Sequence, residues 1–405
     1  MTNNESRNIV IISKDVLSAR YLPTYGNKYW KTPNIDELAA KGTVFRRHYT
    51  AAPSTAMAFT SMFTGKYPYQ TGRKDYTEIE QFDIDGVKTL FDLMYEKGYD
   101  CHLLWSSNYI KMAERFSRCF GNHTIHHDKL ELNQYVGPHM PGDLSELKRD
   151  DKVAEDNYQS LIHEIDTIDR THPIFLWVHL PHVLKGRIAY GDDIDLLDRF
   201  VGDIRIRFGD FIIVTADHGS NDGKDGKTGY GFDVFESSVH IPLITPKIDG
   251  RSEVFDLTSN VDLIDLVAFN RIPKHEYVLS DTAYFEQAHR KLAIIKGNYK
   301  FVYDKMKKTI SLYDIDYDPS ENIDLNKRIM FDSDRRRYVV TSQVLYYPYW
   351  DNVQSVLTSM NGIFNSIWCN GSYFKNLKDK FLKRLKNVYG YWRAVFQTYK
   401  KRANK

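Results

Sequence analysis

The stretch that organises this chain of 405 residues is Ala51-Ala-Pro-Ser-Thr-Ala-Met-Ala-Phe-Thr-Ser-Met-Phe-Thr-Gly65. Pro53 cannot continue a preceding helix, and Ser54 and Thr55 are favourable residues for capping a new one. We therefore expect a helix that begins at Ser54 or Thr55 and stops at Gly65. A hydroxyl at the positive end of such a helix can lose its proton more readily and can receive an anionic group. The stretch alone predicts a capped helix, and with suitable partners it predicts a nucleophile at Thr55.

The composition restricts the class of protein. Hydrophobic residues make up 42% of the chain and charged residues 27%, which is typical of a soluble globular protein with one large domain or two. The net charge of +2 predicts no general attraction to nucleic acid, so we expect no nucleic-acid partner. Cys101, Cys119 and Cys369 follow no metal-ligand spacing, which indicates reduced thiols. With no signal-peptide pattern and no apolar run of membrane-spanning length, the expected location is the cytoplasm.

Patterns typical of buried strands alternate with helical patterns along most of the chain. The expected strands are 8–13, 44–49, 99–105, 173–180, 210–216 and 237–244, and the expected helices are 32–42, 88–97, 151–168 and 192–204. This alternation predicts an α/β fold with a mostly parallel central sheet flanked by helices. The segments 291–303 and 310–314 predict a small antiparallel sheet towards the C-terminus.

Side chains that bind metals occur where two of these strands end. Asp15 follows the first strand, and Asp217-His218 follows the strand 210–216 directly. A carboxylate next to an imidazole is a suitable ligand pair for a divalent cation such as zinc or manganese. Each residue alone has an ordinary structural interpretation, but parallel strands bring their carboxyl ends to one edge of a sheet. The coincidence therefore predicts one site.

Histidines mark further strand ends. The strand 173–180 brings His179 and His182 to the same edge, and His240 is expected to point out of an otherwise apolar strand. A single histidine in such a place is more often structural, so an acid–base role depends on its neighbours. The pair His126-His127 lies in an expected polar loop, where adjacent histidines are more often solvated than metal-binding.

The composition changes beyond Leu325. Residues 373–405 are rich in Lys and Arg, contain one acid, Asp379, and carry apolar residues at intervals of three to four. This pattern predicts a basic amphipathic helix, which could lie on an anionic membrane surface, bind a partner or pack on the rest of the chain. We expect a catalytic domain over 1–328, with the small sheet at about 275–328, and a basic, aromatic, helical extension over 329–405.

With Asp15, Thr55 and Asp217-His218 in place, the chain resembles the sulfatase-like branch of the alkaline phosphatase superfamily. The resemblance keeps the family's order through the segments 8–15, 32–42, 53–55, 63–68, 175–182, 212–219, 239–243 and 312–322. It implies an alkaline phosphatase/sulfatase-like fold. It also implies that Asp15, Thr55, Asp217 and His218 bind the metal and that Thr55 is the nucleophile.

The same resemblance implies roles for three histidines. His240 matches a histidine that lies by the transferred phosphate in the phosphoethanolamine transferases. His179 and His182 match a strand end that lines the substrate pocket, and the sequence leaves open which is closer to the chemistry. In the implied mechanism the metal lowers the pKa of the Thr55 hydroxyl, and Thr55 attacks the ester to form a covalent intermediate. A histidine protonates the leaving oxygen, and water or an acceptor hydroxyl then releases the group.

The chain differs from the family's pattern at two places, and these differences restrict the reactions that we expect it to catalyse. True sulfatases carry a cysteine or serine in a Cys/Ser-x-Pro-x-Arg context that is oxidised to formylglycine, whereas this chain has Thr55-Ala-Met-Ala-Phe59. Formylglycine cannot form from threonine, and an unmodified threonine resembles the phosphoethanolamine and phosphoglycerol transferases. Lys14-Asp15 stands where sulfatases commonly have paired aspartates. Fewer oxygen ligands favour zinc or manganese over calcium.

These observations predict a metal-dependent transferase or hydrolase of phosphate esters. Its expected substrate is an anionic ester, with surface-glycan or lipid-linked esters as candidates, and residues 373–405 provide a possible peripheral contact with the inner membrane face. One alternative is a sulfate-ester hydrolase that works with threonine. Another is a non-catalytic protein that binds anionic glycans, although retention of Thr55 and the metal ligands favours an enzyme.

Overall fold

The computed structural model describes residues 7–71, 86–105, 124–127, 151–180, 191–222, 228–282, 290–326, 329–332, 337–340 and 350–370. The chain forms two compact units, Met1–Leu345 and Tyr346–Lys405. His182 and the expected basic helix of 373–405, with its membrane contact, lie outside the described residues. Among the helices that are described, none combines the length and apolar character needed to cross a bilayer.

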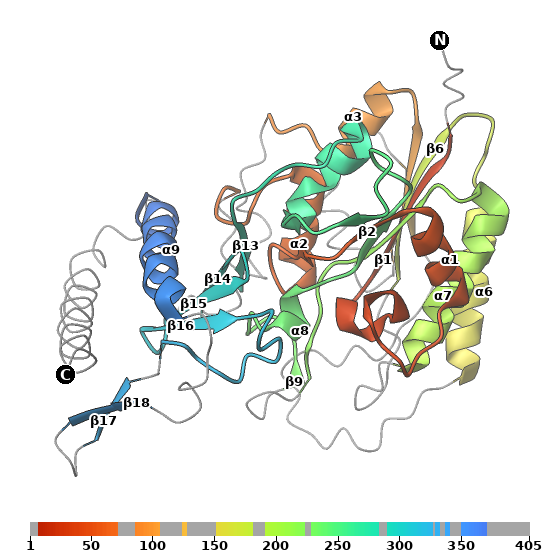
Figure 1. Ribbon diagram of the computed structural model, residues 1–405. Coiled ribbons are helices and arrows are strands. Elements are labelled where there is room, and N and C mark those ends of the chain that lie inside the picture. The colour runs from red at the N-terminus through yellow and green to blue at the C-terminus, as the bar shows by residue number, and fades with distance from the viewer. Residues whose placement is uncertain are drawn as a thin grey trace. The chain divides into compact units, whose positions relative to one another are not determined.

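An eight-stranded sheet forms the centre of the larger unit, in the order β11-β2-β10-β7-β1-β6-β4-β5 (Figure 1). Its strands are β1 (Ile9–Lys14), β2 (Thr43–Phe45), β4 (Asp100–Trp105), β5 (Thr124–His127), β6 (Ile174–Leu180), β7 (Ile212–Ala216), β10 (Leu243–Thr245) and β11 (Glu253–Val254). The strands β7, β1, β6, β4 and β5 run parallel, whereas β10 is antiparallel to β7 and β2. The expected mostly parallel sheet is confirmed.

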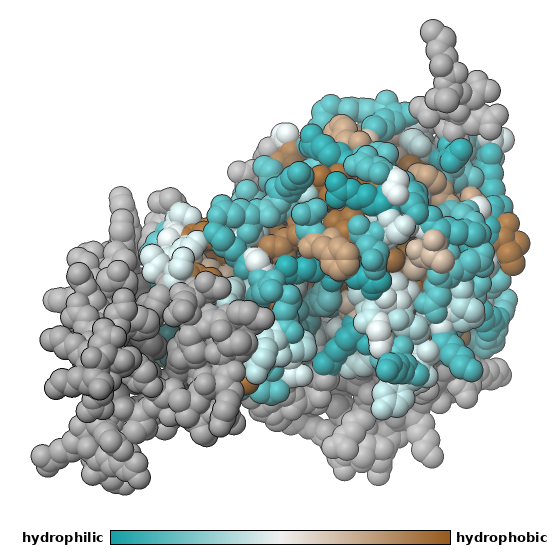
Figure 2. All heavy atoms as spheres, in the orientation of Figure 1, coloured by the Kyte–Doolittle hydropathy of each residue, from teal (hydrophilic) through white to brown (hydrophobic). Residues whose placement is uncertain are grey.

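Helices cover both faces of this sheet (Figure 1). One face carries α1 (Pro33–Lys41), α6 (Asp151–Asp166) and α7 (Gly191–Phe208), and the other carries α2 (Thr55–Thr64) and α3 (Leu90–Glu96). Val10 and Ile12 of β1 belong to the first core, and Ile9 and Ile11 to the second. A strand buried on both faces reads as a continuous apolar run, which explains the sequence of β1. Hydrophilic residues cover most of the described surface seen in Figure 2.

Helix α2 is a core helix, since every residue from Thr55 to Thr64 is buried. Its aromatic side chains pack on Trp177 of β6, with ring centroids 5.8 Å away for Phe59 and 4.9 Å away for Phe63. The helix follows Ser54 and ends at Gly65, which adopts a left-handed conformation with φ of 65°. The predicted helix is confirmed, and aromatic packing fixes its position against the sheet.

The small antiparallel sheet is also confirmed. It has the order β13-β14-β15-β16, with β13 (Val278–Asp281), β14 (Lys291–Lys296), β15 (Tyr299–Asp304) and β16 (Thr309–Asp314). The amide of Asp281 donates to the carbonyl of Ala51 at 2.9 Å, so this sheet adjoins the loop that leads into α2.

The remaining elements complete the described chain. They are the 3-10 turns Ala19–Tyr21, Pro23–Tyr25 and Asn260–Asp262, the π-helical turn Ile264–Ala268, β3 (His48–Tyr49), β8 (Asn221–Asp222), β9 (Thr228–Gly229), α8 (Glu236–Val239), β12 (Thr258–Ser259), β17 (Ile329–Asp332), β18 (Arg337–Val340) and α9 (Trp350–Asn370). β3 pairs with β12, β8 with β9, and β17 with β18. The pair β17–β18 is antiparallel and lies within the extension that was expected to be helical.

Three local predictions were wrong. The expected strand 44–49 divides into β2 and β3, which belong to different sheets. His126-His127 lies in β5 instead of a loop, because this segment extends the parallel sheet beside β4. The expected strand 237–244 contains α8 and the short β10. A contact from a distant part of the chain favours the helical turn α8. Glu321 Oε2 accepts a hydrogen bond from the amide of Glu236, the first residue of α8, at 2.8 Å.

Lys300 joins the small sheet to α8, and its removal should destabilise the protein. Its buried ammonium lies 3.1 Å from Glu236 Oε1 and 2.9 Å from Glu321 Oε1. Lys300→Met leaves both carboxylates without this partner, so we expect a loss of roughly 3 kcal/mol in the free energy of unfolding by urea titration. The matched control is Lys296→Met, which breaks a pair between partly exposed side chains and should cost less than about 1 kcal/mol. Equal losses in the two variants would contradict this role.

Candidate active site

Three side chains of the types that bind metals meet beyond the carboxyl ends of two neighbouring strands. Asp15 follows β1, and Asp217 and His218 follow β7. β1 and β7 are parallel, with Lys14 opposite Ala216, so the residues after each strand lie side by side. Ligand atoms of Asp15, Asp217 and His218 all lie within 4.8 Å of one another.

The backbone after β1 is held by the residues after β7. Val16 has a φ of 60°, which is unusual for a β-branched residue and stores strain. Its amide donates to Asp217 Oδ1 at 3.3 Å, and the amide of Leu17 donates to the carbonyl of His218 at 2.8 Å. Asp217 Oδ1 also accepts from the amide of His218 at 2.7 Å. These bonds fix Asp217 and the turn that carries Asp15 in one arrangement.

The orientation of the His218 ring is set by the residue that follows it. Nδ1 lies 2.8 Å from the carbonyl oxygen of Gly219, which can only accept, so Nδ1 carries the proton. In a neutral ring the lone pair is then on Nε2, which lies 3.4 Å from Asp217 Oδ2 and 3.7 Å from Asp15 Oδ1. A β-carbon at Gly219 would lie 2.1 Å from the carbonyl oxygen of Ser237, so only glycine permits this approach. The ring is arranged as metal-ligating histidines usually are.

Thr55 presents its hydroxyl to the same point. Its Oγ1 lies 3.1 Å from His218 Nε2, and the side chain is 1% exposed. Ser54, the residue before the helix, makes no side-chain capping bond to α2. The amides of the first turn therefore remain available to stabilise negative charge beside Thr55.

The charges in the cluster favour a cation. Burial raises the pKa of Asp217 to about 6, with the charge of Asp15 acting in the same direction and His218 opposing it. Asp15 and Asp217 are 1% and 0% exposed, and two carboxylates in so dry a place repel each other. Two carboxylate oxygens and one imidazole nitrogen form a donor set suited to zinc or manganese. The residues therefore fit a divalent ion.

His179 lies beside the cluster, on β6, with Ser13 of β1 as its register partner. Its Nδ1 lies 3.0 Å from Ser13 Oγ and 3.2 Å from the Ser13 carbonyl oxygen, and Trp177 Nε1 donates to Ser13 Oγ at 2.8 Å. Burial, the largest cause, lowers the pKa of His179 to about 4, against the opposing influence of Asp15. A neutral imidazole at physiological pH suits hydrogen bonding better than proton donation. The sequence prediction had not included Ser13 and Trp177, although their strand register places them with His179.

His240 has a different setting. Its Nε2 donates to the carbonyl of Arg46 at 2.9 Å, and Nδ1 lies 4.0 Å from Glu236 Oε2. The ring packs against Tyr25 and Tyr49, with centroids 6.1 Å and 5.3 Å away. These contacts are typical of a structural histidine. They differ from the contacts of Asp15, Asp217 and His218, which lie together in the cluster.

Two further residues at the site were not among the sequence predictions. Lys14 is 5% exposed, and its Nζ donates to the main-chain oxygen of Asp15 at 3.2 Å. Tyr230 places its ring against His218, with centroids 4.7 Å apart. The flanking Gly229 and Gly231 are the sequence signal that could have drawn attention to Tyr230.

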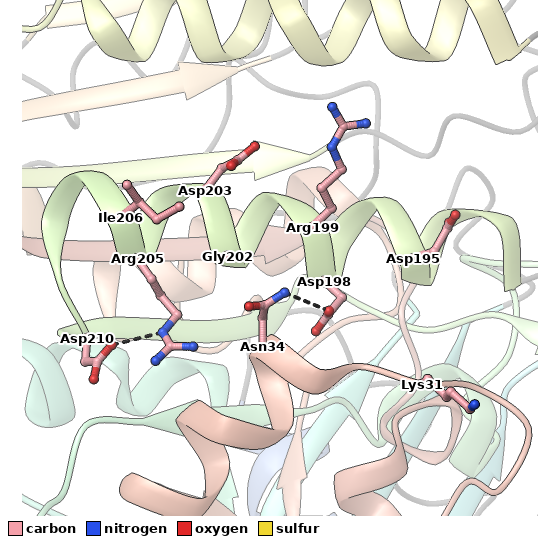
Figure 3. A pocket seen from close by; sticks show the side chains of 10 residues that line it. All are labelled: Lys31, Asn34, Asp195, Asp198, Arg199, Gly202, Asp203, Arg205, Ile206 and Asp210. Carbon is pink, nitrogen blue, oxygen red and sulfur yellow. Dashed lines mark hydrogen bonds and ion pairs between the residues drawn. The ribbon is translucent and has the colours of Figure 1, made fainter.

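A surface hollow of about 620 Å³ lies elsewhere, between α1 and α7 (Figure 3). Two pairs of its lining side chains contact each other: Arg205 pairs with Asp210 at 2.9 Å, and Asn34 donates to Asp198 at 3.0 Å. Asp15, Thr55, Asp217 and His218 are not among the described residues that line it. The hollow lies where α1 and α7 meet, and it is separate from the Asp15–Asp217–His218 cluster.

Comparison with known proteins adds independent information. Residues 7–183 match the family model described as Sulfatase. N-acetylgalactosamine-6-sulfatase of Sus scrofa is 26% identical over 261 residues, which are 53% of this chain and 50% of that protein. Arylsulfatase H of Homo sapiens is 39% identical over 140 residues, which are 31% of this chain and 25% of that protein. The matches to these relatives thus span half of their length or less.

Solved structures extend the likeness to most of the chain. A 2-O GAG sulfatase aligns with a TM-score of 0.65 at 14% identity, covering 90% of this chain and 93% of that one. The phosphonate monoester hydrolase of Agrobacterium radiobacter aligns with a TM-score of 0.59 at 16% identity, covering 87% and 96%. At such identities the likeness establishes the fold.

Ser54→Ala should leave the stability almost unchanged, because the hydroxyl makes no capping bond. Its Oγ has no hydrogen-bond partner among the described residues. We expect a change below about 0.5 kcal/mol in the free energy of unfolding. The control is Thr89→Ala at α3, where Thr89 and Asp92 form a complete capping box, and we expect it to cost about 1 kcal/mol. A loss at Ser54 as large as that at Thr89 would show that Ser54 caps α2.

Asp217→Asn should stabilise the metal-free protein at neutral pH. The raised pKa means that the folded state binds this proton more tightly than the unfolded chain, so this contribution to stability is lost as the pH rises through about 6. An asparagine cannot ionise, so the variant does not lose this stability, and its free energy of unfolding should exceed that of the wild type by about 3 kcal/mol near pH 7.5 and by less than about 1 kcal/mol near pH 4. Urea titrations of chelator-treated protein at both pH values measure the difference. An advantage independent of pH would contradict the assignment to Asp217.

Proposed function

We propose, from the match of residues 7–183 to the family model described as Sulfatase, that the chain is a metal-dependent hydrolase or transferase of anionic esters. Its preferred substrates are phosphate esters, and its covalent intermediate forms on Thr55. The observation that carries the proposal is the distance of 3.1 Å between Thr55 Oγ1 and His218 Nε2, within a buried cluster that includes Asp15 and Asp217.

The residues of the cluster and Thr55 have different proposed roles in the reaction. Asp15, Asp217 and His218 would hold a zinc or manganese ion, which supplies Lewis-acid stabilisation of the anionic ester. Thr55 provides the attacking oxygen from the start of α2, where the helix dipole favours negative charge. The Thr55 hydroxyl hydrogen-bonds Asp217 and lies 3.1 Å from His218 Nε2, so it reaches the same point as the residues that would hold the ion.

The reaction has two steps. In the first, Thr55 Oγ1 gives up its proton and bonds to the central atom of the ester, and the bond to the leaving oxygen breaks as that oxygen takes up one proton, so one proton is released and one is consumed. In the second, water or an acceptor hydroxyl attacks the same atom and restores the Thr55 hydroxyl. The low pKa of His179 assigns it to orienting the substrate or the cluster more than to protonating the leaving oxygen. His182, the other sequence candidate for that step, stays a prediction.

The preference for phosphate rests on the nucleophile. The family's sulfate chemistry uses formylglycine, and Thr55 cannot supply it. The second candidate function is a sulfatase, which is favoured by the names of the relatives, including Steryl-sulfatase of Homo sapiens at 28% identity over 130 residues. Glycan or lipid-linked substrates, a cytoplasmic location and membrane contact through 373–405 stay predictions.

The test is turnover of an aryl sulfate, a phosphate monoester, a phosphate diester and a phosphonate monoester by metal-loaded protein. We expect cleavage of at least one phosphorus ester, with a loss of more than about 10³-fold in Thr55→Ala because the nucleophile is removed. Thr60→Ala is the matched control, since Thr60 belongs to the same buried helix but its hydroxyl donates to the carbonyl of Ala56 within α2. It should keep turnover within about threefold of the wild type.

Other outcomes discriminate between the alternatives. Cleavage of the aryl sulfate alone would replace the phosphate proposal with the sulfatase. Binding of an anionic glycan with no turnover, and with the same affinity in Thr55→Ala, would indicate a non-catalytic binding protein.

A further inference from the structure

We propose that Tyr230 is a positioning residue for His218, and that contact between the two rings strengthens the binding of a divalent cation by the Asp15–Asp217–His218 cluster. The inference rests on the proposed function, since it concerns the same site. It adds a residue to which neither the sequence motifs nor the comparisons gave a role.

The contact is between ring faces. The ring centroids of Tyr230 and His218 are 4.7 Å apart, and the two planes are inclined by 34°. This separation is within the range of favourable aromatic pairs. His218 is completely buried, whereas Tyr230 is partly exposed, so the phenol ring covers the imidazole on a side that leads towards solvent.

A short hairpin returns the chain to His218. β8 and β9 pair antiparallel, with Asn221 opposite Gly229, and Tyr230 follows β9 directly. Ser220 Oγ donates to the carbonyl of Gly229 at 3.1 Å, which ties the end of the hairpin to the residues after His218. The position of Tyr230 is therefore determined by the same local segment that carries the metal ligand.

The backbone conformations on either side of Tyr230 allow its ring to lie against His218. Gly229 and Gly231 have φ values of 104° and 89°, a region that residues with a β-carbon rarely adopt. A glycine on each side lets the chain turn before and after Tyr230 while the aromatic side chain is kept between them.

The ring contact complements the hydrogen bond to Gly219. The bond from Nδ1 fixes which edge of the imidazole faces the backbone, at 2.8 Å from the Gly219 carbonyl oxygen. It leaves the ring able to tilt about that bond, and a tilt would turn Nε2 away from the point between Asp15 and Asp217. Tyr230 opposes the tilt on one face. Loss of the hydrogen-bonded partners that orient a metal-ligating histidine typically weakens metal binding by about 10- to 100-fold. For the ring contact we expect an effect at the lower end of this range.

The experiment is titration of chelator-treated protein with Mn²⁺ by calorimetry, and with Zn²⁺ against a competing chelator dye. Tyr230→Phe keeps the ring and should bind within about twofold of the wild type, whereas Tyr230→Leu should bind about tenfold more weakly. Tyr29→Leu makes the same change at a side chain that is 88% exposed, and it should bind as the wild type does. Urea titration in the absence of metal verifies that each variant folds, and Tyr230→Met provides a second ring-free variant.

The outcomes separate this inference from the proposed function. Wild-type affinity in the folded Leu and Met variants would overturn the positioning role alone. A loss in Tyr230→Phe as large as that in Tyr230→Leu would also overturn it, because the hydroxyl and not the ring would then matter. A wild-type protein that binds neither ion would overturn both this inference and the proposed function. Because affinity is measured without substrate, the readout does not depend on which ester is cleaved.

Discussion

The parallel pairing of β1 with β7 is the constraint on which the site depends. It brings the residues after the two strands together, and so places two buried carboxylates and one imidazole within 4.8 Å of one another. Such a group is unfavourable in a dry interior unless a cation balances it. The strained φ of Val16 and the raised pKa of Asp217 are both consequences of this arrangement. We propose that a metal ion and an anionic substrate offset these two costs at the site.

Two aromatic contacts then complete the geometry. Phe59 and Phe63 pack α2 against Trp177 in the sheet, and the helix presents Thr55 to His218 at 3.1 Å. On another side, Tyr230 lies against the His218 ring. Thr55 and His218, the proposed nucleophile and one proposed ligand, are thus held by separate parts of the chain, one by the hydrophobic core and one by a hairpin that starts just after β7.

The sequence predicted those parts of the protein whose local pattern and tertiary setting agree. β1, β7 and the helix from Thr55 to Gly65 each carry an unambiguous apolar pattern with a clear start or stop. The segment 237–244 failed because a distant carboxylate, Glu321, holds the amide of Glu236 and favours a helical turn in an apolar run. Tyr230 and Ser13 were missed because their roles depend on ring contact and strand register, which no local pattern reveals. Long-range contacts therefore determine local structure and residue roles that the hydrophobic periodicity of the sequence does not predict.

The central claim is that Asp15, Asp217 and His218 bind one divalent ion beside Thr55. Anomalous diffraction at the zinc or manganese absorption edge, from crystals grown with the ion, tests it most directly. The account predicts a peak about 2.0–2.2 Å from a carboxylate oxygen of Asp15, from one of Asp217 and from His218 Nε2. A cluster without a peak in crystals that contain the ion, or a peak held by other residues, would contradict the account.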